Sequence, residues 1–174
     1  VLMLLLSSFW AVFQQKIQRV IAYVIVAENG ISLLLIGMQS EASFSVFISN
    51  LFIQILGLLV WSLALKQIEP ESDLTFESLK GLFWSKPMTA LALLTAYFSL
   101  TGLPLFPGFS LRLSFISICF EYGTFYGWTS ALGCWILILT GGKILYYLLF
   151  REQKQFTKEN KTQRVLMGSS ILIL

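Results

Sequence analysis

Three charged side chains stand inside apolar stretches of this 174-residue sequence and are its candidates for chemistry. Glu28 lies near the middle of one stretch, Arg112 lies in the longest stretch, and Lys143 lies in a later one. A charge at the centre of a bilayer costs on the order of 3 kcal/mol on insertion scales, so such residues face a protein interior and often line ion paths. We therefore predict that these three residues are buried charges and candidates for a proton path.

Each of the three residues also has a purely structural interpretation. Glu28 and Arg112 are compatible with an ion pair that only locks two helices together, or with a lateral contact to another subunit. Arginine stays protonated in proteins, so Arg112 holds a fixed charge and cannot relay a proton by releasing one. Lys143 lies near the polar end of its stretch, where its ammonium can snorkel to the lipid headgroups.

The longest stretch, residues 88–122, contains a helix-breaking motif in its middle. A straight helix of this length runs roughly 50 Å, beyond a ~30 Å bilayer core, whereas two full spans need about 40 residues and a turn. The motif, at 102–108, has two glycines and two prolines: Gly102, Pro104, Pro107 and Gly108. Prolines remove donors and clash with the preceding turn, so the helix must break here. Broken helices mark ion and substrate sites in transporters.

The elements that would position these charges are transmembrane helices, each of which needs about 20 apolar residues. The apolar segments lie at 1–13, 20–38, 44–65, 88–122 (broken at 102–108), 125–150 and 165–174 (partial). We therefore expect an all-α fold, a polytopic transmembrane helix bundle with one broken helix. Residues 1–174 are expected to form a single transmembrane domain.

The cations of the loops support a single crossing by the broken stretch. With one crossing, ten lysines and arginines fall on the same side of the membrane: Lys16, Arg19, Lys66, Lys80, Lys86, Arg151, Lys154, Lys158, Lys161 and Arg164. The opposite side carries only Glu41 and Glu121. Two crossings would move the polar tail and remove this asymmetry. By the positive-inside rule, the basic side is expected to face the matrix or the cytoplasm.

Composition excludes several classes of protein. Hydrophobic residues make up 56% of the chain and charged residues 12%, against about 25% charged residues in an average soluble domain. The chain has no histidine, no P-loop, no GxGxxG and no cluster of metal-type ligands, so no cofactor or metal is expected on it. Cys119 and Cys134 lie in apolar runs and are expected to be small buried hydrophobes. The net charge of +3 gives no indication of nucleic-acid binding.

Four short segments together resemble one family, the antiporter-like subunits of respiratory complex I. They are Gln18–Tyr23 (QRVIAY), Lys80–Pro87 (KGLFWSKP), Ser99–Phe109 (SLTGLPLFPGF) and Ile144–Leu148 (ILYYL). The segment around the break is the most specific of them. Within the family, the resemblance is nearest to NADH dehydrogenase subunit 2, called subunit N in bacteria, and it covers only the C-terminal part of the antiporter-like fold.

This resemblance implies a role in the proton-translocating membrane arm of NADH:ubiquinone oxidoreductase. The chain would contribute part of a subunit-2-like proton channel, with NADH, FMN, iron–sulfur clusters and quinone on other subunits. The family's broken-helix lysine falls on Arg112, and a histidine position falls on Glu28. The implied partners are other membrane-arm subunits, lipids and a separate chain that supplies the N-terminal helices. The implied location is the mitochondrial inner membrane, with a bacterial plasma membrane as the alternative.

Two other functions are compatible with the sequence. One is a subunit of an Mrp-type cation/proton antiporter, which the segment around the break does not exclude. The other is a structural relic of the module that no longer conducts protons, which arginine at position 112 in place of lysine would favour. The set of co-purifying chains distinguishes complex I from the antiporter.

Overall fold

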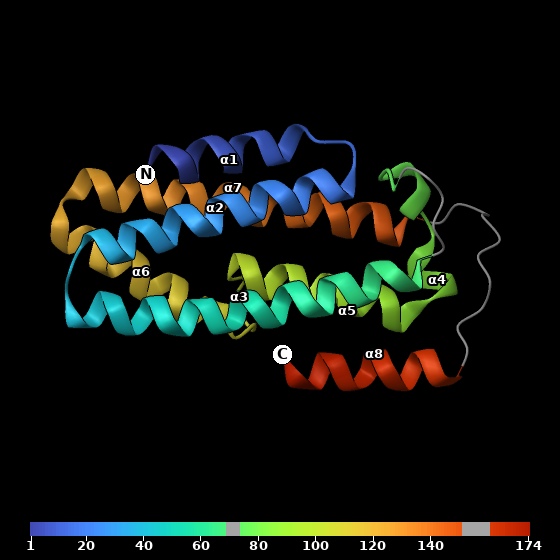
Figure 1. The fold of residues 1–174 in the computed structure, drawn as a ribbon. Helices are drawn as coiled ribbons and strands as arrows, with labels where there is room; N and C mark the ends of the chain where they lie inside the picture. Colours follow the sequence, from blue (N-terminus) through green and yellow to red (C-terminus); the bar gives the residue numbers. More distant parts are fainter. Residues whose placement is uncertain (69–73, 151–160) are drawn as a thin grey trace.

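A computed structural model of the chain describes residues 1–68, 74–150 and 161–174, and over these residues it is a bundle of helices that share one long axis (Figure 1). The helices are α1 (Leu2–Phe13), α2 (Ile17–Gly37), α3 (Glu41–Gln67), the 3₁₀ helix η1 (Glu77–Leu79), α4 (Leu82–Ser85), α5 (Pro87–Thr101), α6 (Gly108–Tyr122), α7 (Thr124–Leu149) and α8 (Lys161–Ile173). No strand is found in the described part of the chain, where Lys16 and Thr75 form an isolated bridge. The fold is all-α, as expected.

Several helices begin before the apolar segments from which they were predicted. α3 begins at Glu41 because Ser40 and Ser43 form a capping box, in which each hydroxyl accepts a hydrogen bond from the other residue's backbone N–H at 3.0 and 3.1 Å. Hydropathy alone places the start of this helix at residue 44. A search for apolar segments leaves out the polar residues at a helix end, although their side chains bind the free backbone N–H groups there.

Within the described residues, three helices are long and apolar enough to cross a membrane: α2, α3 and α7. Their outward faces are apolar, and α3 exposes large side chains along its length: Phe44, Ile48, Phe52, Ile55 and Leu59. A soluble protein rarely exposes such a continuous apolar face. The outer surface is therefore suited to lipid or to neighbouring transmembrane helices.

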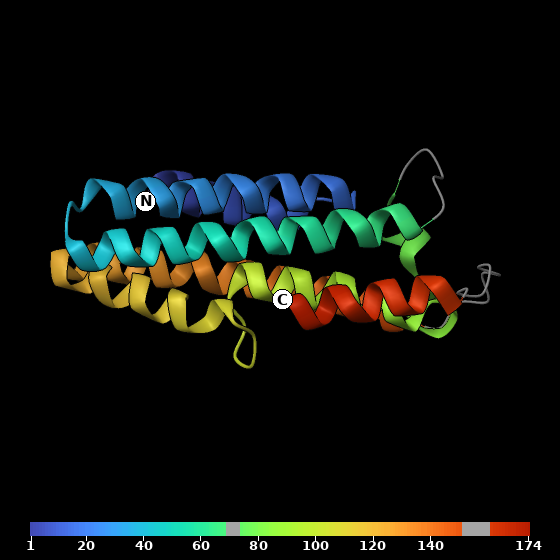
Figure 2. The ribbon, with the colours of Figure 1, turned by 60° about the horizontal axis from the view of Figure 1, so that its bottom comes forward.

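The stretch 88–122 forms two half-helices of 15 residues each, α5 and α6, which follow one another in the same direction along the bundle (Figure 1). Their connection protrudes from the side of the bundle (Figure 2). α5 ends at Thr101 and is followed by Gly102, which adopts the left-handed conformation with φ of 75°. Pro107 occupies the position immediately before α6. The chain therefore traverses the length of the bundle once over this stretch.

The basic loops lie together at one end of the bundle. The α1–α2 link, the described residues 74–86 ahead of α5 and the start of α8 share this end, and the α2–α3 and α6–α7 turns lie at the other (Figure 1). Five of the ten cations predicted to share one side of the membrane lie at this end: Lys16, Arg19, Lys66, Lys80 and Lys86. Glu41 starts α3 and Glu121 is near the end of α6, at the opposite end. Arg151, Lys154 and Lys158 lie outside the described residues.

Two side chains just ahead of α5 bind the ends of other helices at the basic end. Lys86 Nζ donates a hydrogen bond to Gln67 O at the end of α3, at 3.0 Å. Trp84 Nε1 donates to Leu149 O at the end of α7, at 3.2 Å. Because the last carbonyls of a helix have no donor within it, these side chains satisfy groups that would otherwise remain unpaired.

Replacing Gly108 with alanine is expected to destabilise the fold at the break. A Cβ at Gly108 would lie 1.9 Å from Ser99 O, a backbone atom that cannot move aside. Overpacking of this kind costs about 1–3 kcal/mol or more. The matched control is Gly142→Ala in α7, where an added Cβ meets nothing within 4 Å. The thermal midpoint of the complex that contains the chain should fall for Gly108→Ala and hold or rise for the control. Equal midpoints would contradict the proposed packing.

Candidate functional site

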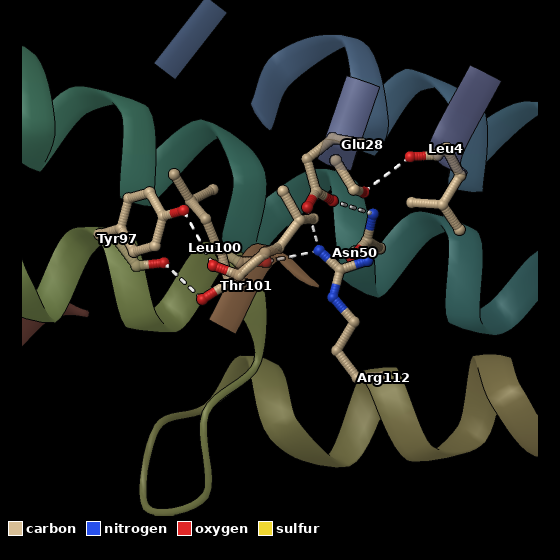
Figure 3. A network of polar contacts seen from close by, with 9 residues as sticks. Leu4, Glu28, Asn50, Tyr97, Leu100, Thr101 and Arg112 are labelled. Carbon is tan, nitrogen blue, oxygen red and sulfur yellow. Dashed lines mark hydrogen bonds and ion pairs between the residues drawn. The ribbon is translucent and has the colours of Figure 1, made fainter. Parts of the chain in front are cut away.

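The structure brings Glu28 and Arg112 together in the interior of the bundle (Figure 3). Arg112 Nη2 donates hydrogen bonds to Glu28 Oε1 and to the backbone oxygen of Leu100. Asn50 Nδ2 donates to the other carboxylate oxygen of Glu28 at 3.3 Å. The site therefore joins α2, α3 and α6 to the end of α5.

The charges of this pair are almost completely buried. The exposed fraction is 1% for Glu28, 4% for Arg112 and 7% for Asn50. Removing charges from water is costly, and close pairing with further hydrogen bonds compensates for it. Each charge is therefore tolerated in the bundle because the other is present.

The break itself supplies a partner for Arg112. In a continuous helix, Leu100 O would accept from the N–H of residue 104, but that residue is Pro104, which has none. The guanidinium of Arg112 takes the place of the missing donor. The prolines thus free a carbonyl inside the bundle, and the arginine satisfies it.

The glycines of the break allow Arg112 to reach this carbonyl. A Cβ at Gly102 would lie 2.1 Å from Arg112 Cγ, and Gly108 packs against Ser99 O. Both positions need a residue without a side chain. Arg112 lies one turn into α6, so the close approach of α6 to the end of α5 places its guanidinium against Leu100 O.

Lys143, the third predicted charge, does not join the ion pair. Its Nζ donates to Val12 O at 2.9 Å and to Gln14 O at 2.8 Å, and it lies 4.7 Å from the centroid of the Phe76 ring. The ammonium therefore binds the end of α1 instead of reaching for headgroups. The site predicted from sequence separates into an internal ion pair and a helix-end cap at the basic end.

Several polar residues of the interior carry no charge, so the positions of charged residues in the sequence do not indicate them. Asn50 lies in the one long apolar segment that has no charged residue, and it is buried against Glu28. Tyr97 donates its hydroxyl to Leu137 O at 3.0 Å and packs its ring 5.9 Å from that of Trp61. A buried amide in an otherwise apolar helix is the signal that would have identified Asn50.

The chemistry available at this site is electrostatic and protonic. Glu28 is the member of the pair that can exchange a proton, while Arg112 keeps its charge. Among the described residues, no group of three or more His, Cys, Asp or Glu side chains is placed to hold a metal ion. Both cysteines are buried free thiols.

The fold and the site define a multi-pass helical membrane protein in which a broken helix places an ion pair inside the bundle. The profile of the family described as NADH:quinone oxidoreductase/Mrp antiporter, TM, matches residues 1–138. The chain belongs to this family, and the expected resemblance to the antiporter-like subunits of complex I is confirmed.

Individual relatives agree with this assignment. The chain is 31% identical over 125 residues to NADH-quinone oxidoreductase subunit N of Deinococcus radiodurans, covering 70% of this chain and 25% of that protein. It thus spans about a quarter of the length of this relative. Subunit N is the bacterial equivalent named in the sequence resemblance.

Solved structures show the same fold at lower sequence identity. A chain of respiratory complex I from Thermus thermophilus with bound Aureothin superposes with a TM-score of 0.82 at 22% identity, covering 99% of this chain and 40% of that one. A chain of the Mrp complex from Dietzia sp. DQ12-45-1b gives 0.80 at 22% identity, covering 90% and 30%. The antiporter-like fold is therefore shared by both kinds of complex.

Removing either charge of the pair is expected to be more harmful than removing both. Glu28→Gln leaves Arg112 without a counter-charge, and Arg112→Met leaves Glu28 without one, each at a cost of about 3–5 kcal/mol. The double variant contains no buried charge and should recover most of this loss. The amount of assembled complex in membranes measures the effect, with the exposed acid Glu41→Gln as the control. A double variant as poor as the sum of the single variants would rule out the pairing.

Lys143→Met is expected to loosen the end of α1, because two carbonyls lose their donor. The expected cost is about 1–3 kcal/mol, the usual penalty for unsatisfied polar groups. Lys143→Arg should retain part of the stability, and Lys66→Met, at an exposed position, serves as the control. The thermal midpoint of the complex reports the change. A midpoint for Lys143→Met that equals that of Lys66→Met would show that Lys143 only snorkels.

Proposed function

We propose that this chain forms part of a proton-conducting module of the subunit N type in the membrane arm of a respiratory complex I. The observation that carries the proposal is the buried Glu28–Arg112 pair at the break between α5 and α6. A charge pair at a proline-made break inside the membrane is costly to maintain, and such sites commonly serve ion movement. The sequence identity to subunit N of Deinococcus radiodurans supports complex I as the host.

The two charges have different tasks in this proposal. Glu28 carries the exchangeable proton, since it is the carboxylate of the pair. Arg112 provides a fixed positive charge that would repel positive charge on basic groups of the rest of the antiporter-like fold and so favour onward movement of a proton. Asn50 and Leu100 O hold the two charged groups in place through hydrogen bonds. The break keeps this cluster within the bundle instead of at its surface.

The remainder of the assembly is supplied by other parts. Other membrane-arm subunits surround the module, and the rest of the antiporter-like fold comes from a longer form of this polypeptide or from a separate chain. NADH, FMN, the iron–sulfur clusters and quinone are bound by other subunits, and this chain binds none of them. The mitochondrial inner membrane is the first candidate location, and a bacterial plasma membrane is the second. The basic end faces the matrix or cytoplasm.

An Mrp-type antiporter is the second candidate function, because the Mrp complex of Dietzia sp. DQ12-45-1b has a chain of the same fold. Co-purification distinguishes the two hosts. Flavin and iron–sulfur subunits in the purified complex support complex I, whereas their absence from an intact complex supports the antiporter. A relic that conducts no protons is the third candidate, and it makes the opposite prediction for the variants of Arg112.

Variants of Arg112 test whether its charge contributes to proton movement. Arg112→Lys keeps a positive charge but has fewer donors, so assembly and proton pumping should lie between those of the parent and those of Arg112→Met. Arg112→Met is combined with Glu28→Gln, so that no buried charge is left unpaired and assembly survives. This double variant should retain NADH–quinone turnover and lose most proton pumping. Normal pumping by the double variant would show that the pair has no protonic role and would favour the relic.

A further inference from the structure

Gln54 is a second buried amide on the face of α3 that meets the break. Asn50, Gln54 and Gly57 are spaced four and three residues apart, so they lie on one face of the helix. Asn50 binds Glu28, and the chain at Gly57 packs against the Leu100 side chain, which a Cβ there would meet at 2.8 Å. Gln54 thus lies between a residue that binds Glu28 and a residue that contacts Leu100.

The direction of helical side chains places the Gln54 amide toward the ion pair. Side chains on a helix lean toward its N-terminus, so Gln54 leans over the turn that contains Asn50. Figure 3 shows Asn50, Glu28 and the Arg112 guanidinium meeting at this turn. The Gln54 side chain is 8% exposed, so it lies within the bundle.

Two complementary polar atoms on these residues have no hydrogen-bond partner in the described part of the chain. They are Gln54 Oε1, an acceptor, and Arg112 Nη1, a donor. The hydrogen bonds of Arg112 to Glu28 and Leu100 both use Nη2. Buried polar groups in native proteins are nearly always paired. Here the unpaired donor is on α6 and the unpaired acceptor is on α3, two helices that pack against each other.

We infer that Gln54 is a positioning residue that provides a second acceptor for Arg112, through Nη1, directly or across one bound water. Glu28 then holds the guanidinium from the α2 side and Gln54 holds it from the α3 side. A neutral amide suits this place, because a second carboxylate would leave the site with a net negative charge. Gln54 touches no transported group and acts only through Arg112.

This role deepens the proposed function and rests on it. When a proton reaches Glu28, the carboxylate becomes neutral and its attraction for Arg112 weakens. Leu100 O and Gln54 Oε1 remain as acceptors, so the guanidinium keeps its position inside the bundle. The ion pair can therefore be lost while Arg112 stays in place. The proton can then leave from the same carboxyl group.

Charge relocation in the complete membrane complex tests the contact. Glu28→Gln should lower the amount of assembled complex at least fivefold, because Arg112 loses its counter-charge. Adding Gln54→Glu should restore assembly to within twofold of the parent, since the carboxylate then faces Arg112 from α3. Adding Gln39→Glu, an exposed glutamine near the α2–α3 turn, should restore nothing. Failure of Gln54→Glu to restore assembly, or equal restoration by Gln39→Glu, overturns the inference.

A second measurement decides the case if Glu28→Gln assembles normally. In that background, Gln54→Leu and Arg112→Met are made singly and together, and the thermal midpoint of the complex is measured. Non-additive shifts support the contact and additive shifts overturn it.

Proton pumping per NADH oxidised separates the contact from the function. Gln54→Leu should lower this ratio at least twofold with NADH–quinone turnover unchanged, which a residue that only fills space would not do. Restored assembly together with normal pumping by Gln54→Leu supports the Gln54–Arg112 contact and counts against the proposed proton role.

Discussion

Backbone hydrogen bonding in a medium without water is the constraint on which the rest of this structure depends. Lipid satisfies no N–H or C=O group, so each interruption of a helix must find its partners within protein or in a wet cavity. Pro104 removes the donor for Leu100 O, and Arg112 restores one. The arginine is therefore structural and electrostatic at once, because the donor that repairs the backbone also carries a charge.

The charge on that donor explains the rest of the cluster. A guanidinium inside the bundle needs a counter-charge, which Glu28 provides from α2, and the carboxylate needs a further donor, which Asn50 provides from α3. The loss of one backbone donor at Pro104 is thus compensated by three interacting side chains from three helices. At the basic end, Lys86 and Lys143 bind the free carbonyls of helix ends. These lysines need no buried counter-charge, because water and headgroups are near.

The parts of this arrangement that follow from local chemistry could be predicted from sequence. Two prolines and two glycines in an apolar stretch require a broken helix, and the positions of loop cations favour one crossing. An ion pair between Glu28 and Arg112 was one interpretation of the sequence, but sequence alone could not choose it over a contact to another subunit. The two residues are 84 positions apart, and their contact depends on how α2, α3 and α6 pack. Asn50 and Gln54 escaped notice because hydropathy treats an isolated amide in an apolar helix as a minor interruption. For Lys143, the sequence left a buried charge and a snorkelling side chain as alternatives, because it does not show that the end of α1 lies beside this residue.

The use of arginine where the family resemblance has lysine changes what the break can do. A lysine on the broken helix can release its proton, so charge at that point can disappear during transport. Arginine cannot, so any change of charge in this cluster must occur on Glu28. Its planar guanidinium also has more donors than an ammonium, and it can bind Leu100 O and Glu28 while another nitrogen faces α3. A proton moving through this site would therefore pass the fixed charge of Arg112. Glu28 is the residue whose protonation would change.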